Sequence, residues 1–181
     1  MNINNNIIET NPFDHIMYEF LMYVQASICQ STEQFVTNLL VDSRMVHMRN
    51  IAYFFCSKKD RRKKDLHYST YILERLPNEI DHELLNTIQR IASNSTCHLL
   101  KGRFSEAFKH ETAVLEQTVF PILITLIKNF LEAARESVRP EYEILWQDNQ
   151  IQENVSYLEK MISDLRTDLN EIMITSSTGS N

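Results

Sequence analysis

Residues 151–172 read IQENVSYLEKMISDLRTDLNEI and carry the clearest pattern in the chain. Their apolar residues recur in alternating steps of four and three, the spacing at which side chains share one face of an α-helix. These residues are Ile151, Val155, Leu158, Ile162, Leu165, Leu169 and Ile172. Mostly β-branched a positions with leucine-containing d positions favour a parallel dimer, and packing of this helix inside a bundle is the alternative.

The composition of the whole chain also favours helices. Its 181 residues include only 2 glycines and 4 prolines, whereas folds rich in strands and tight turns need more turn glycines. A chain of this length fits one domain and buries enough surface to need no metal or disulfide. We therefore expect an all-α fold, an up-and-down helical bundle with a long heptad-patterned C-terminal helix.

Changes in composition divide the chain into four segments. We expect residues 1–10 to form a flexible, asparagine-rich arm and residues 11–138 to form the helical bundle domain. Residues 139–174 are predicted to form a coiled-coil-like C-terminal helix. The Ser/Thr/Gly-rich residues 175–181 are predicted to be a disordered tail.

Helix boundaries follow from capping residues and apolar spacing. Asn11-Pro12 is typical of a helix start, with asparagine as N-cap and proline at the first helical position. Pro121 either opens a helix or kinks a continuing one. The predicted helices cover about 12–30, 33–57, 66–76, 81–102, 105–116, 121–137 and 140–174.

Charge and cysteine usage bear on the location of the protein. The net charge of −6 argues against a surface that coats nucleic acid generally. The three cysteines are far apart and form no CxxC pair, which suits a reducing compartment. The N-terminus lacks the basic start and apolar core of a signal peptide, and the longest apolar run, 119–127, is too short to span a bilayer. We expect a cytoplasmic protein with no membrane partner.

Polar residues interrupt the apolar faces of two predicted helices. Ser43, His47 and Asn50 share one face of the first, and Ser95 and His98 share one face of the second. Two inward-facing histidines can converge on one pocket, where imidazole suits a general base. The alternative is a pair of core histidines that neighbouring helices satisfy. Carboxylates at ligand spacing are missing from these faces, so we expect no metal and no other cofactor.

The string His98-Leu99-Leu100-Lys101-Gly102 resembles the HxxKG signature of histidine phosphotransfer domains, which are also helical bundles. The resemblance implies that His98 would accept a phosphoryl group and that Lys101 would offset its charge. Gly102 would let a receiver domain approach. A phosphotransfer protein in a two-component relay is therefore one functional hypothesis.

Residues 42–55, DSRMVHMRNIAYFF, together with the later segment 95–99, are similar to a group of uncharacterised bacterial helical proteins. Those proteins carry an H-x-R-N-x-x-x-F-F-like segment and a later apolar-His-Leu segment. The group in turn resembles the HEPN superfamily, four-helix proteins of toxin–antitoxin and phage-defence systems. Active HEPN ribonucleases use Arg-[polar]-x-x-x-His. Here Asn94 and His98 match that motif, whereas Ser93 replaces its arginine.

The HEPN resemblance implies metal-independent RNA cleavage at a site often paired across a homodimer. His98 would act as base with His47 nearby, and Arg49 or Arg103 would stabilise the charged phosphorane. Because the motif arginine is replaced, our leading expectation is a degenerate RNA-directed ribonuclease or a non-catalytic interaction module. A purely structural dimerisation module is the further alternative, since it needs no site.

A basic run follows the first two long predicted helices and is a candidate RNA contact. Tyr68 and Tyr71 follow it as candidate stacking residues. An acidic protein partner and a solvated loop are the alternatives, because clustered like charges favour exposure. The basic residues of the run are Lys58, Lys59, Arg61, Arg62, Lys63 and Lys64.

Overall fold

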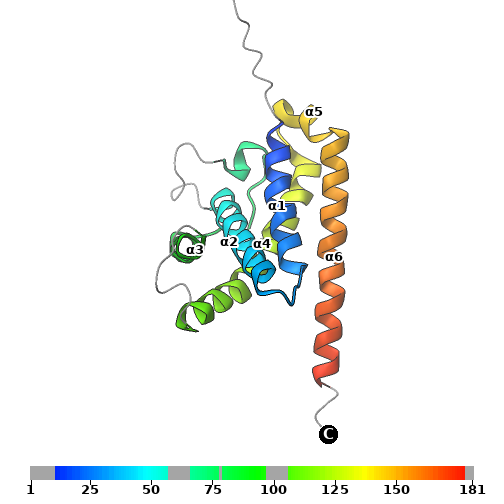
Figure 1. Cartoon of the computed structure of the whole chain (residues 1–181). Helices are drawn as coiled ribbons and strands as arrows, with labels where there is room; N and C mark the ends of the chain where they lie inside the picture. Colours follow the sequence, from blue (N-terminus) through cyan, green and yellow to red (C-terminus); the bar gives the residue numbers. More distant parts are fainter. Residues whose placement is uncertain (1–10, 57–65, 78, 97–105, 178–181) are drawn as a thin grey trace, which may run out of the picture.

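The computed structural model describes residues 11–56, 66–77, 79–96 and 106–177, and for 94–96, 106–109 and 166–177 it describes the backbone alone. Every regular element in these residues is helical, so the predicted all-α bundle is confirmed (Figure 1). The elements in chain order are α1 (Pro12–Ile28), α2 (Gln34–Phe54), η1 (Tyr68–Thr70), α3 (His82–Thr96), α4 (Glu106–Ser137), η3 (Pro140–Tyr142), α5 (Glu143–Trp146) and α6 (Asn149–Ser177).

Helix α1 packs against two long helices (Figure 1). One is α2, which follows it directly in the chain, and the other is α6, the last helix. Helix α2 also packs against α3, and α4 contacts α2, α3 and α6. The predicted N-cap of α1 is confirmed, because Asn11 Oδ1 accepts a hydrogen bond from Phe13 N at 3.0 Å. Asn11 Nδ2 also donates to Leu145 O at 2.8 Å, which ties the start of α1 to α5.

Aromatic rings from three helices meet in the centre of the core. Phe20 of α1 stacks on Phe55 with ring centroids 5.8 Å apart. Phe54 of α2 meets Phe130 of α4 edge-on at 5.2 Å. Such pairs contribute about 0.5–1.5 kcal/mol each beyond the burial of their area. The C-terminal end of α2 is therefore fixed between α1 and α4.

The first heptad residues of the last helix pack inside the chain. Ile151, Val155, Leu158 and Ile162 are all buried in the core that includes α1. The prediction that this helix begins at Pro140 is wrong, because η3 and α5 come first and α6 begins at Asn149. Residues 175–177, predicted to lie in a disordered tail, continue α6.

The late start of α6 has a local cause. Trp146 is buried at the end of α5, with its ring 5.1 Å from that of Phe13 on α1. The chain must therefore turn at this point, and Asp148 Oδ1 caps the new helix by accepting from Gln150 N at 2.9 Å. Capping chemistry and the burial of one indole separate α5 from α6.

The predicted short helix over 66–76 is also wrong, and only the turn η1 forms there. Backbone groups of this segment bond to distant partners, which prevents an i to i−4 ladder. Leu73 N donates to Ser137 O at 2.9 Å, and Arg139 N donates to Tyr71 O at 2.8 Å. Farther along, Ile80 N donates to Phe55 O at 2.9 Å. The segment is thus held against the ends of α2 and α4.

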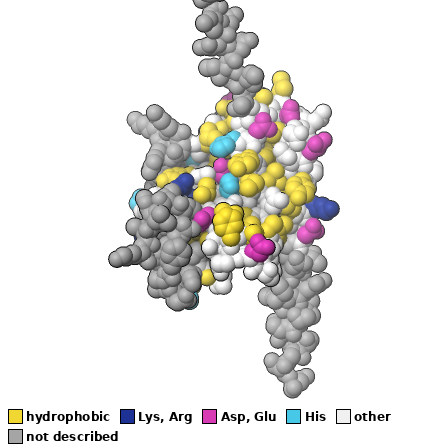
Figure 2. Space-filling view, in the orientation of Figure 1, with side chains coloured by type: hydrophobic (Ala, Val, Ile, Leu, Met, Phe, Trp, Pro, Cys, Tyr) yellow, Lys and Arg dark blue, Asp and Glu magenta, His cyan; other side chains and the backbone are white. Residues whose placement is uncertain are grey.

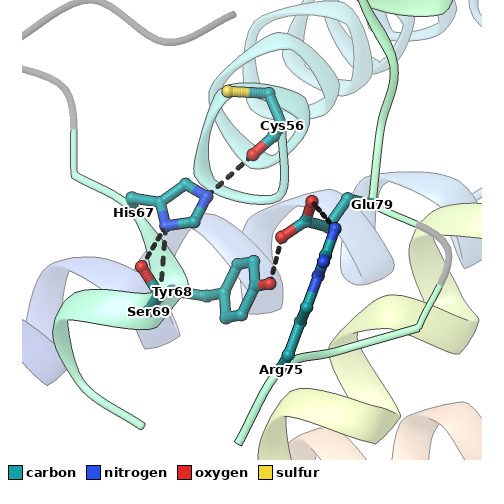
Figure 3. Close-up of polar contacts among 6 residues, drawn as sticks. All are labelled: Cys56, His67, Tyr68, Ser69, Arg75 and Glu79. Carbon is teal, nitrogen blue, oxygen red and sulfur yellow. Dashed lines mark hydrogen bonds and ion pairs between the residues drawn. The ribbon is translucent and has the colours of Figure 1, made fainter. Parts of the chain in front are cut away.

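His67 anchors the start of that segment to the end of α2 (Figure 3). Its fully buried ring accepts at Nδ1 from Ser69 N at 3.2 Å, and its Nε2 lies 2.7 Å from Cys56 O. Because Nδ1 accepts, the ring proton is on Nε2, which donates to the carbonyl. Tyr68 OH donates to Glu79, which Arg75 also contacts at 3.3 Å.

Helix α4 continues through Pro121, so the first predicted alternative, a new helix opening there, is wrong. By length and composition, the stretch His110–Ser137 is the one helix in the described part of the chain that could span a membrane. Core helices pass the same test, and the side chains of Leu123, Ile127 and Phe130 lie in the core here.

We predict that His67→Leu will lower the free energy of unfolding by about 1–3 kcal/mol, because Cys56 O and Ser69 N each lose a buried partner. Ser69→Ala removes only the hydroxyl beside Nδ1 and should cost less, about 0.5–1.5 kcal/mol. Urea denaturation of both variants measures the difference. Equal losses would contradict the anchoring role of the imidazole.

Candidate functional site

Several predicted site residues lie outside the described part of the chain. Their predicted roles in catalysis, phosphotransfer and RNA binding stay predictions. These residues are His98, Arg103, Lys58, Lys59, Arg61, Arg62, Lys63 and Lys64. The side chains of Asn94 and Ser95 are likewise outside the description, although both residues belong to α3. The predicted site on α2 can be placed.

His47 of α2 is buried and faces α1. Its Nδ1 lies 2.7 Å from Oε2 of Glu19, and the ring of Tyr18 packs edge-on against it at 5.6 Å. Asn50, one turn along α2, donates from Nδ2 to the same Glu19 oxygen at 3.1 Å. Two of the predicted polar residues therefore converge on one carboxylate.

A second histidine approaches the other oxygen of Glu19. His15 lies one turn earlier on α1, and its Nε2 is 3.8 Å from Oε1. This is within ion-pair distance and beyond hydrogen-bonding distance. On the face seen in Figure 2, histidine and acidic side chains lie next to one another among hydrophobic side chains.

The remaining predicted residues of α2 do not join this group. Ser43 is half-buried and makes no hydrogen bond with the described residues. Arg49 is also half-buried, and its position two residues after His47 places it about 200° around the helix. Arg44 is engaged elsewhere, because its Nε donates to Glu116 at 2.8 Å and its Nη1 to Ala26 O at 3.0 Å.

Glu19 is held in its ionised form. Burial acts to raise the pKa of this carboxyl, but the hydrogen bonds from His47 and Asn50 and the nearby imidazoles outweigh burial, so the pKa is lowered from 4.5. An ionised carboxylate only accepts hydrogen bonds, so His47 Nδ1 carries a proton. The pair thus consists of an imidazole oriented by a carboxylate.

A pocket of about 270 Å³ opens beside this pair, between α1 and α2. Glu19, Asn50 and His15 contribute polar groups to its wall, and His47 is not among the lining side chains. The remaining lining residues are Ile16, Phe20, Ile51, Tyr53, Phe54 and Leu66. The pocket therefore presents the Glu19 carboxylate and the His15 side chain to a ligand, but not the His47 imidazole.

A larger hollow of about 390 Å³ lies between α1, α2, α4 and α6. Its walls include the Arg44–Glu116 ion pair and the ring of Phe120. Tyr23 also lines it, and within the described structure the buried hydroxyl of Tyr23 has no hydrogen-bond partner. Because that hydroxyl is sealed from solvent, it does not open a binding position in this hollow.

Glu19 is the site residue that the sequence prediction missed. Its signal was present, because Glu19 lies three residues after Ile16 and four before Tyr23, on the apolar face of α1. A carboxylate at such a position must find a partner on a neighbouring helix. Glu19 lies on α1, whereas the predicted absence of carboxylates concerned the helix face of His47 itself.

In comparison with known proteins, no family model, no curated protein and no solved structure matches the chain.

We predict that Glu19→Gln will destabilise the protein by about 1–3 kcal/mol near neutral pH, because two charge-assisted hydrogen bonds are lost. The lowered pKa means that the ionised carboxylate stabilises the folded state above pH 4.5, and that this contribution disappears as pH falls through the folded-state pKa. The wild type and the variant should therefore converge in stability on the acid side of pH 4.5.

Urea denaturation across this pH range provides the measurement. Glu159→Gln is the matched control, since Glu159 pairs with Arg135 on the surface and should contribute only about 0–1 kcal/mol. Parallel pH curves for the wild type and Glu19→Gln would refute the assigned charge state.

Proposed function

We propose that this chain is a HEPN-like cytoplasmic protein of a toxin–antitoxin or phage-defence system that works by binding protein chains, including a second copy of itself. The observation that carries the proposal is an apolar pair on the first half of α2. Phe35 is 72% exposed and Leu39 is 51% exposed. The likeness of residues 42–55 to HEPN-related proteins supports the choice of biological system.

Phe35 and Leu39 are four residues apart and so lie on the same side of α2. Val36 and Leu40 beside them are only half-buried, and no residue from 34 to 44 is fully buried. The second half of α2 is different, because it provides Met45, Met48, Ile51 and other buried side chains to the core. Adjacent exposed apolar side chains of this size are typical of an interface.

A second copy is a suitable partner for this surface. In a two-fold symmetric dimer, the same patch serves both sides of the interface, so an apolar pair can bury itself against its own copy. The heptad residues Ile151 to Ile162 are already buried within the chain, which leaves the α2 surface as the better-supported contact.

The polar group on α1 and α2 is less suited to RNA cleavage. Glu19 presents a negative charge to the pocket, and among the residues that the structure describes no lysine or arginine lines it. A phosphodiester would meet repulsion, whereas nucleases place cations where phosphate charge develops. These features favour the interaction module over the degenerate ribonuclease.

We predict that the wild type sediments as a dimer at micromolar concentration and that Phe35→Glu with Leu39→Glu produces a monomer, because two carboxylates would be buried in the interface. Ile144→Glu is the matched control, since Ile144 of α5 is 87% exposed and lies outside the α2 surface. A monomeric wild type, or a double variant that stays dimeric, would refute the proposed interface.

We also predict that the purified protein leaves structured and single-stranded RNA intact, with or without a chelator. Gel analysis of labelled RNA over time provides the measurement, with His98→Ala and His47→Ala measured in parallel. Cleavage by the wild type that disappears in His98→Ala would establish a ribonuclease and refute the non-catalytic proposal.

A further inference from the structure

Glu19 carries a buried negative charge without a permanent positive partner in the described structure. Glu19 is 8% exposed, and among the described residues only the imidazoles of His15 and His47 lie within ion-pair distance of its carboxylate. Asn50 supplies a hydrogen bond but no charge. Buried carboxylates in proteins are ordinarily paired with a cation, because an unpaired charge is costly to remove from water.

One oxygen of Glu19 has no hydrogen-bond donor among the described residues. His47 and Asn50 both bond to Oε2. Oε1 accepts no hydrogen bond from the described residues, since the nearest donor, His15 Nε2, is 3.8 Å away. This oxygen belongs to a residue that lines the pocket between α1 and α2. A donor that enters the pocket can therefore complete the coordination of the carboxylate.

The other walls of the pocket suit an organic cation on an alkyl stem. The half-buried Tyr53 supplies an aromatic ring beside the more deeply buried Phe20 and Phe54, and aromatic rings attract cations electrostatically. Leu66 supplies an apolar surface against which methylene groups can pack. A metal ion fits less well, because the described residues contain no group of three histidine, cysteine or acidic side chains arranged to hold one.

We propose that this pocket binds the ammonium or guanidinium group of a lysine or arginine side chain presented by a protein partner. The group would donate to Glu19 Oε1 while its alkyl stem lies along the aromatic and apolar walls. That the cation comes from a protein chain rests on the proposed function. That the pocket binds a cation does not, so small probes can test the pocket separately.

The probes are N-acetyl-lysine methylamide and N-acetyl-arginine methylamide, and N-acetyl-norleucine methylamide is the uncharged control. Titration of the full-length protein, followed by NMR shifts of the amides of Glu19, Asn50 and Tyr53, measures binding. We expect saturable shifts with the charged probes, weakened by added salt, and none with norleucine. Equal shifts with norleucine, or no shifts with either charged probe, would overturn the proposal.

Glu19→Gln should weaken binding of the charged probes at least about tenfold, because a charge-assisted hydrogen bond is replaced by a neutral one. Glu159→Gln keeps the pocket intact and should bind as the wild type does. Unchanged affinity in Glu19→Gln would overturn the proposal.

A second variant tests the cation position and leaves Glu19 unchanged. His15→Lys places an ammonium one turn from Glu19 on α1, where it can occupy the cation position from within the chain. We expect a higher melting temperature and at least about fivefold weaker probe binding. Gln25→Lys adds the same charge at an exposed position of α1 outside the pocket and should change neither.

The results separate this inference from the proposed function. If the charged probes bind but the Phe35 and Leu39 variant is dimeric, the pocket chemistry stands and the interface proposal fails. If the wild type is a dimer but His15→Lys binds probes as tightly as Gln25→Lys does, the cation position is wrong and the interface proposal stands.

Discussion

The burial of α1 between α2 and α6 is the constraint on which the rest of the bundle depends. Phe13, Met17, Phe20 and Val24 are all withdrawn from water, and a side chain of that size contributes roughly 1.5–3 kcal/mol when fully buried. A helix covered on two sides has little room for polar groups. Each polar group on the covered faces of α1 therefore needs a hydrogen-bond partner on a neighbouring helix. Glu19 is such a group, and its partners determine the chemistry of the site.

The partners of Glu19 support our proposal that the site binds a ligand. His47 and Asn50 both approach from α2 and use the same oxygen, which fixes the carboxylate in one orientation. The imidazole of His47 does not line the pocket, whereas the Glu19 carboxylate does, beside His15. The same two hydrogen bonds couple the charge state of the pocket to the packing of α1 on α2, so a ligand that stabilises the carboxylate also stabilises the bundle.

The sequence predicted those features that local pattern controls. The Asn11-Pro12 cap and the apolar spacing of α2 and α6 depend on residues a few positions apart, and the corresponding helices form. The errors arose where distant contacts decide. His67 holds the 66–77 segment against the end of α2. Burial of Trp146 breaks the last helix. Neither contact can be recognised from the residues next to it in the sequence. The polar group on α2 was predicted, but its carboxylate on α1 required a pairing of helices.

The packing of α1 against α6 also has a consequence for synthesis of the protein. Ribosomes release the N-terminal helix long before the segment that covers its second face, and Asn11 cannot reach Leu145 until that segment has emerged. The apolar side of α1 therefore stays open until α6 has emerged, and exposed apolar surface makes a nascent chain prone to aggregate. Closure of this fold therefore waits for synthesis of α6, and a chain terminated before α6 would be a substrate for chaperones and proteases.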